Sequence, residues 1–351
     1  EMCIRDRYNM FSKTLLSPND LRAFLPLSQE QQSFISKART TIQNILTEKD
    51  SRILLCIGPC SVHNINAFLE FASLFKDMIR EFSSKFYFVL RAYFEKPRTN
   101  GGWPGFLYDP FLDNSSDIST GIHTTRNTLL ELCKLGIPIV TEFVDPLASY
   151  YLDDIVSFVC IGARTVTSPI HRRLASNLSC PVGFKNSLSG SIEDAVYGMN
   201  QASISHAFIG INPDGKISKI LSKGNPYSSI ILRGGINGPN YTDTYIGETV
   251  DLLQKYRLPT NIIVDCAHGN SKKDFHKQID IFESIIYRKV LSPASPIKGM
   301  FLESYLKNHN QILSASTPKS DVSITDPCLD WNSTYNLIKK SYLKLSDVTI
   351  L

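Results

Sequence analysis

Polar residues of the kinds that bind metals and anions recur where short apolar runs of the sequence end. Eight runs, from ILLCIG (53–58) to GMFLE (299–303), are each ended or closely followed by such a residue. In chain order these residues are Cys60, Arg91, Glu142, Arg164, Lys185, Arg233, His268 and Glu303. One polar residue after an apolar run is common, but eight in succession predict that one end of the fold gathers functional groups.

Basic residues form the first candidate group. Its members are Arg91, Lys96, Arg98, Arg164, Lys185 and Arg233. Guanidinium groups match phosphate and carboxylate oxygens, and clustered cations repel one another unless anions lie between them. The group therefore predicts a ligand with two or three negative groups. The alternative is that each cation pairs with an acid at the surface. Lys185 has a further candidate role as a Schiff-base amine, since flanking cations favour its neutral form.

A thiol, an imidazole and two carboxyl groups form the second candidate group, made of Cys60, His268, Glu303 and Asp326. Together these donors suit one divalent transition metal ion, such as Mn, Fe, Co or Zn. No short spacing motif joins them, so the metal site depends on the fold bringing them together. Taken singly, Cys60 is typical of a buried core residue and His268 of a hydrogen-bonded polar residue.

The apolar runs themselves predict a parallel sheet. They lack the alternation of half-buried strands, and stretches with helical periodicity separate them, as in a repeating βα order. The run HAFIGI (206–211) differs, because NPDG links it to KISKIL, and Pro-Asp-Gly is a turn signal. We therefore interpret 206–221 as an inserted β-hairpin. The remaining eight runs predict a (β/α)8 TIM barrel, in which the C-terminal strand ends form one face.

The residues before the first strand predict an N-terminal addition. Ser28 and Gln31 make a capping box for a helix over 28–46 with one apolar stripe. We assign residues 1–9 as non-native or disordered, 10–50 as an extension for regulation or oligomerisation, and 51–351 as the catalytic barrel. Met10 is a plausible start of the native chain.

Composition narrows the function classes. The 351 residues are 42% hydrophobic and 20% charged, with a net charge of +4 and no basic run, which disfavours a nucleic-acid partner. No stretch approaches the roughly 18 unbroken apolar residues of a membrane span. The N-terminus lacks the apolar core of a signal peptide, and none of the eight cysteines forms a CxxC pair. These features predict a cytoplasmic protein with reduced thiols.

Several collinear blocks carry a family resemblance. They are IGPCSVH (57–63), RAYFEKPRTNGGWPG (91–105), IGARTVTSPIHRRLASNLSCPVGFKN (161–186), ILRGG (231–235), DCAHGNS (265–271) and SITDPC (323–328). These blocks closely resemble type I 3-deoxy-D-arabino-heptulosonate 7-phosphate (DAHP) synthases. The resemblance implies a TIM barrel that condenses phosphoenolpyruvate with erythrose 4-phosphate, the first step of the shikimate pathway.

The resemblance also implies roles for individual residues. Cys60, His268, Glu303 and Asp326 match the family's ligands for one divalent metal ion. Arg91 and Lys185 match the contacts of the phosphoenolpyruvate carboxylate, and Ala163, Arg164 and Arg233 those of its phosphate. Lys96 matches a catalytic residue near the reacting carbons, Glu142 a residue that holds water, and Pro97, Arg98 and Thr99 belong to the segment that binds erythrose phosphate. Ala267, Val322, Pro104 and KNSLSG (185–190) depart from the usual pattern without removing a ligand.

Regulation and assembly follow from the same resemblance. Members of the family form homodimers or homotetramers, and an aromatic amino acid inhibits many of them. Ser179 and Phe208 match positions that line the effector site of sensitive members. The alternative is that these two residues only pack a subunit interface.

Three other functions remain open. They are the sister condensation with arabinose 5-phosphate, a Schiff-base aldolase that uses Lys185, and a catalytically silent barrel that acts as a regulatory partner. The KPRT segment, the extension and the hairpin favour the erythrose enzyme over the first of these.

Overall fold

The computed structural model, which describes residues 13–313 and 317–347, is built around a closed barrel of eight parallel strands. Around the barrel the order is β1-β10-β9-β8-β5-β4-β3-β2. The strands are β1 (Ile53–Gly58), β2 (Phe86–Arg91), β3 (Ile139–Glu142), β4 (Phe158–Ile161), β5 (Val182–Lys185), β8 (Ser228–Leu232), β9 (Ile262–Asp265) and β10 (Ile297–Glu303). This confirms the predicted (β/α)8 TIM barrel.

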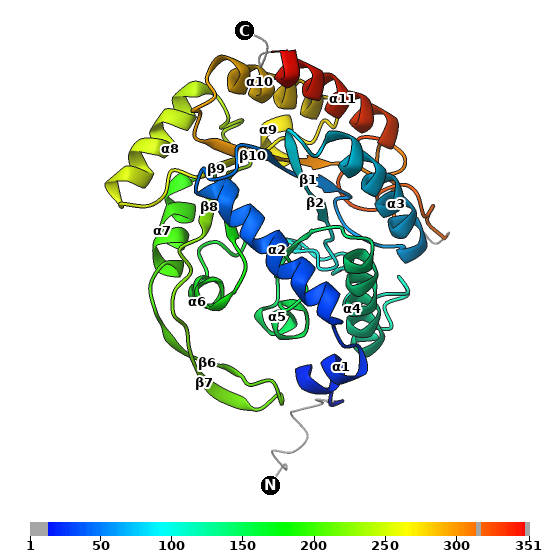
Figure 1. Cartoon of the computed structure of the whole chain (residues 1–351). Coiled ribbons are helices and arrows are strands. Elements are labelled where there is room, and N and C mark those ends of the chain that lie inside the picture. Colours follow the sequence, from blue (N-terminus) through cyan, green and yellow to red (C-terminus); the bar gives the residue numbers. More distant parts are fainter. Residues whose placement is uncertain (1–12, 314–316, 348–351) are drawn as a thin grey trace.

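Helices surround the barrel, as Figure 1 shows. They are α3 (Ile65–Phe82), α4 (Ile118–Lys134), α5 (Pro146–Leu152), α6 (Pro169–Asn177), α7 (Ile192–Ala202), α8 (Asp243–Lys255), α9 (His268–Ser271), α10 (Lys277–Leu291) and α11 (Trp331–Asp347). Helix α3 begins directly after Asn64, whose side chain caps it by accepting from the Ala67 N–H at 3.0 Å. Each helix in the described part of the chain is too short or too polar to span a bilayer.

The barrel strands are buried because both of their faces meet apolar partners. One set of side chains fills the barrel interior, including Leu54, Val89, Phe158, Ile263 and Phe301. The other set packs outward against the helices. Strands covered on both faces need no polar alternation, which explains the continuous apolar runs in the sequence.

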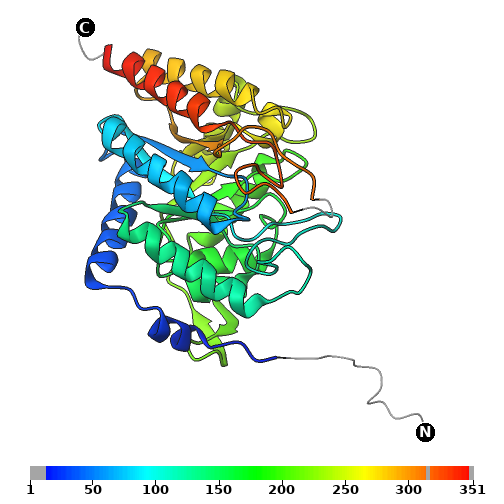
Figure 2. The ribbon, with the colours of Figure 1, turned by 90° about the vertical axis from the view of Figure 1, so that its right-hand side faces the viewer.

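The N-terminal extension closes one end of this interior. Helix α1 (Pro18–Phe24) precedes α2 (Gln29–Leu46), which crosses the barrel in Figure 1. The predicted capping box of Ser28 and Gln31 begins α2. Ile42, Ile45 and Leu46 pack into the same cluster as the barrel interior. In Figure 2, α2 and the long loops that carry the polar strand ends lie at opposite ends of the barrel.

The predicted hairpin is also present, outside the barrel. Strands β6 (Ala207–Ile211) and β7 (Ile217–Leu221) pair antiparallel as a separate two-stranded sheet. Gly215 adopts a φ of +78° in the connecting turn, a conformation that glycine allows without strain. Ile209 and Ile217 are each 83% exposed, so one apolar face of the hairpin points to solvent.

Candidate active site

A cavity of about 560 Å³ lies at the C-terminal end of the barrel. It is lined by all of the residues that the sequence assigned to substrates or catalysis, namely Arg91, Lys96, Pro97, Arg98, Thr99, Glu142, Ala163, Arg164, Lys185, Arg233 and His268. Arg91, Glu142 and Lys185 are the last residues of β2, β3 and β5. The strand ends therefore gather these groups, as the barrel prediction required.

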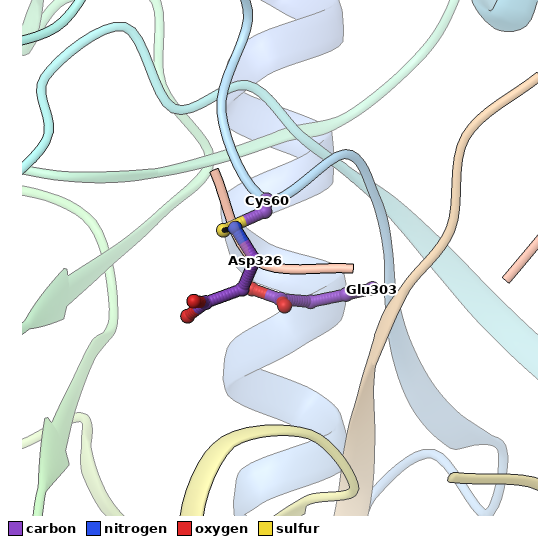
Figure 3. Close-up of side chains that lie close together, drawn as sticks. All are labelled: Cys60, Glu303 and Asp326. Atoms are coloured by element: carbon purple, nitrogen blue, oxygen red, sulfur yellow. Dashed lines mark hydrogen bonds between the residues drawn. The ribbon is translucent and has the colours of Figure 1, made fainter. Parts of the chain in front are cut away.

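Three of the four metal-ligand candidates form a compact group beside this cavity. One ligand atom each from Cys60, Glu303 and Asp326 lies within 4.8 Å of the other two. Figure 3 shows the three side chains converging from separate segments of the chain. Cys60 is fully buried, whereas Glu303 and Asp326 line the cavity wall.

His268 lies at the edge of this group rather than inside it. Its Nε2 is 3.5 Å from Glu303 Oε1, and its Nδ1 is 2.9 Å from Asp265 Oδ2. An imidazole held on one nitrogen by a carboxylate is the usual arrangement of a histidine that ligates a metal with its other nitrogen. His268 also has a φ of +55°, a left-handed conformation that is strained for a non-glycine residue and is concentrated at functional sites.

The donor set fits a divalent transition metal ion. Burial raises the pKa of the Cys60 thiol to about 11, and the charge of Glu303 adds to this rise. Burial also raises the pKa of Asp326, but Lys96, His268 and Lys273 outweigh it and bring the value to about 2. The site thus offers an ionised carboxylate and a thiol that metal coordination would deprotonate.

Lys96 joins the two candidate groups. Its Nζ lies 2.8 Å from Cys60 Sγ. Burial lowers the pKa of Lys96, but the neighbouring Cys60, Asp326 and Glu303 outweigh it and raise the pKa above its usual value. Lys96 is therefore a fixed positive charge at the boundary between the thiol and the cavity.

The basic residues divide into two sets, and those of the first set contact acids. Arg91 Nη2 contacts Glu303 Oε1 at 3.0 Å, and Lys185 Nζ contacts Glu142 Oε2 at 3.4 Å. Both cations are buried. In these two cases the alternative of pairing with an acid holds, although the pairs lie inside the cavity wall and not at the surface.

The other basic residues face the cavity without such partners. Within the described ranges, no ion pair joins Arg98, Arg164 or Arg233 to an acid. Arg164 Nε donates to Thr99 Oγ1 at 2.7 Å, which ties two predicted phosphate-binding residues together. Arg91 Nη1 is buried with no hydrogen-bond partner among the described residues. This surplus of donors is what an anionic ligand needs.

Three acidic or basic neighbours of the site were missed from the sequence. Asp265 ends β9 and contacts both His268 and Lys185, the latter at 4.0 Å. Burial raises its pKa, but His268, Lys185 and Arg91 bring the pKa below the usual range. The position of Asp265 at the end of the NIIVD run could have identified it as a site residue. Nothing in the sequence around Lys273, which lies 3.0 Å from Asp326, indicates that it belongs to the site.

The third missed neighbour is Glu95, which precedes Lys96. Its carboxyl accepts from the backbone N–H of Val144 and Asp145 at 3.2 and 2.9 Å, and from the Tyr108 hydroxyl at 3.2 Å. Burial raises the pKa of Glu95 to about 8. Glu95 thus joins the segment that carries Lys96 to the segment that follows Glu142.

The two regulatory candidates lie outside the catalytic cavity. Ser179 is exposed and its hydroxyl accepts from Arg39 Nη1 of α2 at 2.7 Å. It lines a groove together with Arg22 and Asp153. Phe208 is half-buried in β6 and pairs with Ile220 of β7. Each residue therefore contacts one of the two additions to the barrel.

Comparisons with known proteins agree with the resemblance seen in the sequence. The model of the DAHP synthetase I family matches residues 26–339. The Tyr-sensitive phospho-2-dehydro-3-deoxyheptonate aldolase of Escherichia coli K12 is 39% identical over 338 residues, covering 95% of this chain and 94% of the relative. The Trp-sensitive aldolase of the same strain is 37% identical over 329 residues, covering 93% and 94%.

A solved structure resembles the whole fold. The phospho-2-dehydro-3-deoxyheptonate aldolase of Francisella tularensis SCHU S4 superposes with a TM-score of 0.94 at 35% sequence identity. The match covers 97% of this chain and 99% of that protein. With a family model over most of its length and relatives near 39% identity, this chain belongs to the DAHP synthetase I family.

Proposed function

We propose that this chain condenses phosphoenolpyruvate with D-erythrose 4-phosphate and water, forming DAHP and phosphate as the first step of the shikimate pathway. The observation that carries the proposal is a cation-lined cavity beside the group of Cys60, Glu303 and Asp326. Two phosphorylated substrates need cations to bind their negative charges, and a Lewis acid can activate an aldehyde electrophile. The cations and the candidate metal ligands lie at the same end of this barrel.

The cavity residues bind and orient the two substrates. We assign the phosphoenolpyruvate carboxylate to Arg91 and Lys185, which already lie beside acids and present buried positive charge. Its phosphate goes to Arg164, Arg233 and the backbone N–H of Ala163. The phosphate of erythrose 4-phosphate goes to Arg98 and Thr99, beside Pro97. The hydrogen bond from Arg164 to Thr99 supports this assignment, because it joins one residue of each proposed phosphate subsite.

The condensation then follows the polarity of the substrates. C3 of phosphoenolpyruvate attacks the aldehyde carbon, water adds at C2, and cleavage of the C–O bond releases phosphate. One divalent ion of Mn, Fe, Co or Zn, held by Cys60, His268, Glu303 and Asp326, would supply Lewis acidity toward the aldehyde oxygen. The Lys96 ammonium can donate a proton to the oxygen formed there, and the Glu142 carboxylate can hold the water.

A Schiff base on Lys185 is not required by this chemistry. The Lys185 ammonium contacts the carboxylates of Glu142 and Asp265, an arrangement that suits a fixed charge and not a nucleophilic amine. Borohydride reduction in the presence of erythrose 4-phosphate, whose aldehyde could form an imine, should therefore leave Lys185 unmodified.

Phosphate release from phosphoenolpyruvate tests the proposed function. With metal and erythrose 4-phosphate the chain should release phosphate in step with DAHP formation, and EDTA should abolish both. Omitting the aldehyde reveals simple phosphatase activity, and arabinose 5-phosphate in its place tests the sister reaction. A catalytically silent barrel would release phosphate under none of these conditions, and the proposal would then be wrong.

We propose that the extension (10–50) and the hairpin (206–221) serve assembly and control. The exposed Ile209 and Ile217 provide an apolar surface of the kind that subunit interfaces cover, which supports a homodimer or homotetramer. The two relatives described above are named Tyr-sensitive and Trp-sensitive. An aromatic amino acid near Ser179 and Phe208 is the corresponding effector here.

Two measurements separate these roles. Sedimentation should give a dimer or tetramer for the wild type and a smaller species for Ile209→Asp with Ile217→Asp. Assays with Phe, Tyr and Trp should show inhibition by one of them, which Ser179→Ala weakens. No inhibition by any of the three at millimolar concentration would leave Ser179 and Phe208 as packing residues only.

We place the protein in the cytoplasm. All seven described cysteines are free and buried, which suits a reducing compartment. Thiol labelling of the protein in intact cells and after denaturation would test this placement.

A further inference from the structure

Tyr93 lines the catalytic cavity, but the proposed reaction assigns it no role. It follows β2 and is only 4% exposed. Its backbone is held on both sides, because its carbonyl accepts the Val62 N–H at 2.9 Å and the neighbouring Ala92 N–H donates to Val140 at 2.9 Å. The ring therefore has a fixed place in the wall of the site.

The ring lies against the two cations that we assign to the phosphoenolpyruvate carboxylate. Arg91 Cζ is 4.2 Å from the centre of the Tyr93 ring, and Lys185 Nζ is 5.5 Å from the same centre. Both distances fall within the roughly 6 Å over which a cation interacts favourably with an aromatic face. The two cations come from different strands, β2 and β5, and one aromatic side chain serves both.

Tyr93 contributes no charge of its own. Burial raises the pKa of its phenol well above the usual value, so the side chain stays neutral. Its hydroxyl is buried close to the Cys160 thiol of β4, so the ring face is what Tyr93 presents to the two cations. Carboxylates already contact both cations from other sides, Glu303 at Arg91 and Glu142 at Lys185. The ring adds attraction without a further negative charge that would compete with the substrate carboxylate.

We propose that Tyr93 is a positioning residue that holds the Arg91 guanidinium and the Lys185 ammonium side by side, so that both reach one substrate carboxylate. The aromatic face attracts both cations and adds no negative charge to those of Glu303 and Glu142 beside them. This inference rests on the proposed function for the identity of the carboxylate. It predicts that the ring governs phosphoenolpyruvate affinity and leaves erythrose 4-phosphate affinity unaffected.

The test compares variants of position 93 in the metal-loaded full chain. Tyr93→Leu should weaken phosphoenolpyruvate binding, measured by calorimetry without the aldehyde, by about tenfold or more. The KM for erythrose 4-phosphate should change by less than about threefold. Tyr93→Phe retains the ring and should restore the affinity lost in Tyr93→Leu.

The matched control is Tyr87→Leu, because Tyr87 faces Arg52 at 5.0 Å at the other end of the barrel. That variant also loses an aromatic–cation pair and should bind phosphoenolpyruvate as the wild type does. In case Tyr93→Leu does not fold, phenylalanines with increasing ring fluorination at position 93 keep the shape and weaken only the cation attraction. Affinity should then fall stepwise with fluorine number.

Three results would overturn the inference. One is unchanged phosphoenolpyruvate affinity in Tyr93→Leu or across the fluorinated series. Another is equal loss of affinity for both substrates, which indicates general disruption of the site. The third is a Tyr93→Phe variant as weak as Tyr93→Leu, which assigns the effect to the hydroxyl. Failure of the proposed function is distinguishable, because the wild type itself would then form no DAHP.

Discussion

The two ends of the barrel interior differ in how their charged residues are paired. At the N-terminal end, α2 covers the opening with Ile42, Ile45 and Leu46, and the ionic groups there form simple pairs between Lys298 and Glu48 and between Arg52 and Asp50. At the C-terminal end the described residues surround the opening with loops, and cations outnumber the acids that contact them.

Buried ionisable groups also differ between the two ends. At the N-terminal end, the hydrogen bond from Arg52 lowers the pKa of Asp50, as expected for an acid that has a partner. At the C-terminal end, nearby cations outweigh burial and lower the pKa of Asp326 to about 2, whereas burial raises that of the Cys60 thiol to about 11. The N-terminal pairs are complete in themselves, whereas the C-terminal end combines a buried thiol with carboxylates and cations that a metal ion and anionic ligands can bind. Substitutions at comparable positions of the two ends test whether the C-terminal end serves activity and the N-terminal end serves stability.

The largest effect on activity is expected from Cys60→Ala. Loss of one proposed metal ligand should reduce kcat/KM by roughly a thousandfold, because Lewis-acid stabilisation of the transition state amounts to several kcal/mol. DAHP formation and metal content should be measured on the same sample. A variant with full activity and no thiol would show that Cys60 is only a core residue.

Ile42→Ala tests the opposite end of the barrel. Ile42 is fully buried, so the truncation should lower the free energy of unfolding by about 2–5 kcal/mol. Below the melting temperature kcat and both KM values should stay unchanged. Leu291→Ala, at a side chain that is 68% exposed, serves as the control in the same denaturant titrations. A large fall in kcat for Ile42→Ala would mean that the two ends are coupled.

Lys185→Gln compares one buried lysine at each end. It should raise the KM for phosphoenolpyruvate by about 10- to 100-fold, since a hydrogen bond to a charged group contributes about 1.5–3 kcal/mol. Lys298→Gln removes an equally buried lysine that pairs with Glu48 at the N-terminal end, and it should leave both KM values as they are. Equal effects of the two substitutions would contradict the division of roles.

Glu95→Gln should change stability in a way that depends on pH. A glutamate in the unfolded chain loses its proton near pH 4.3, and the raised pKa of Glu95 is about 8 in the folded chain. Between these values the folded state binds the extra proton, so wild-type stability falls as pH rises. The unfolding free energy of the variant relative to the wild type should therefore rise from about pH 5 to pH 8 and then level off. A pH-independent difference would contradict the assignment.

The barrel could be predicted because the patterns that indicate its strands and turns lie among neighbouring residues. Each strand is a short run of apolar residues, and the turn between β6 and β7 carries Pro213 and Gly215, so eight strands and one hairpin follow from neighbouring residues. Helix α1 was missed, since its seven residues are too few to show a stripe.

The candidate site could be predicted only in part, because its pairing is long-range. The strand ends identified the side chains that line the cavity. Arg91 and Glu303 are 212 residues apart in the chain, and nothing local indicates that they pair. The same holds for the Tyr93 ring, whose proximity to Lys185 depends on the order of strands around the barrel.

The position of a bound metal ion tests the central claim most directly. Crystals of the chain grown with Mn²⁺ should give one anomalous peak per chain, among Cys60 Sγ, His268 Nε2 and the carboxylates of Glu303 and Asp326. This peak should be absent in Cys60→Ala crystals grown in the same way, because the variant lacks the proposed thiolate ligand. A manganese ion located elsewhere in the cavity, with Cys60 outside its coordination sphere, would contradict it.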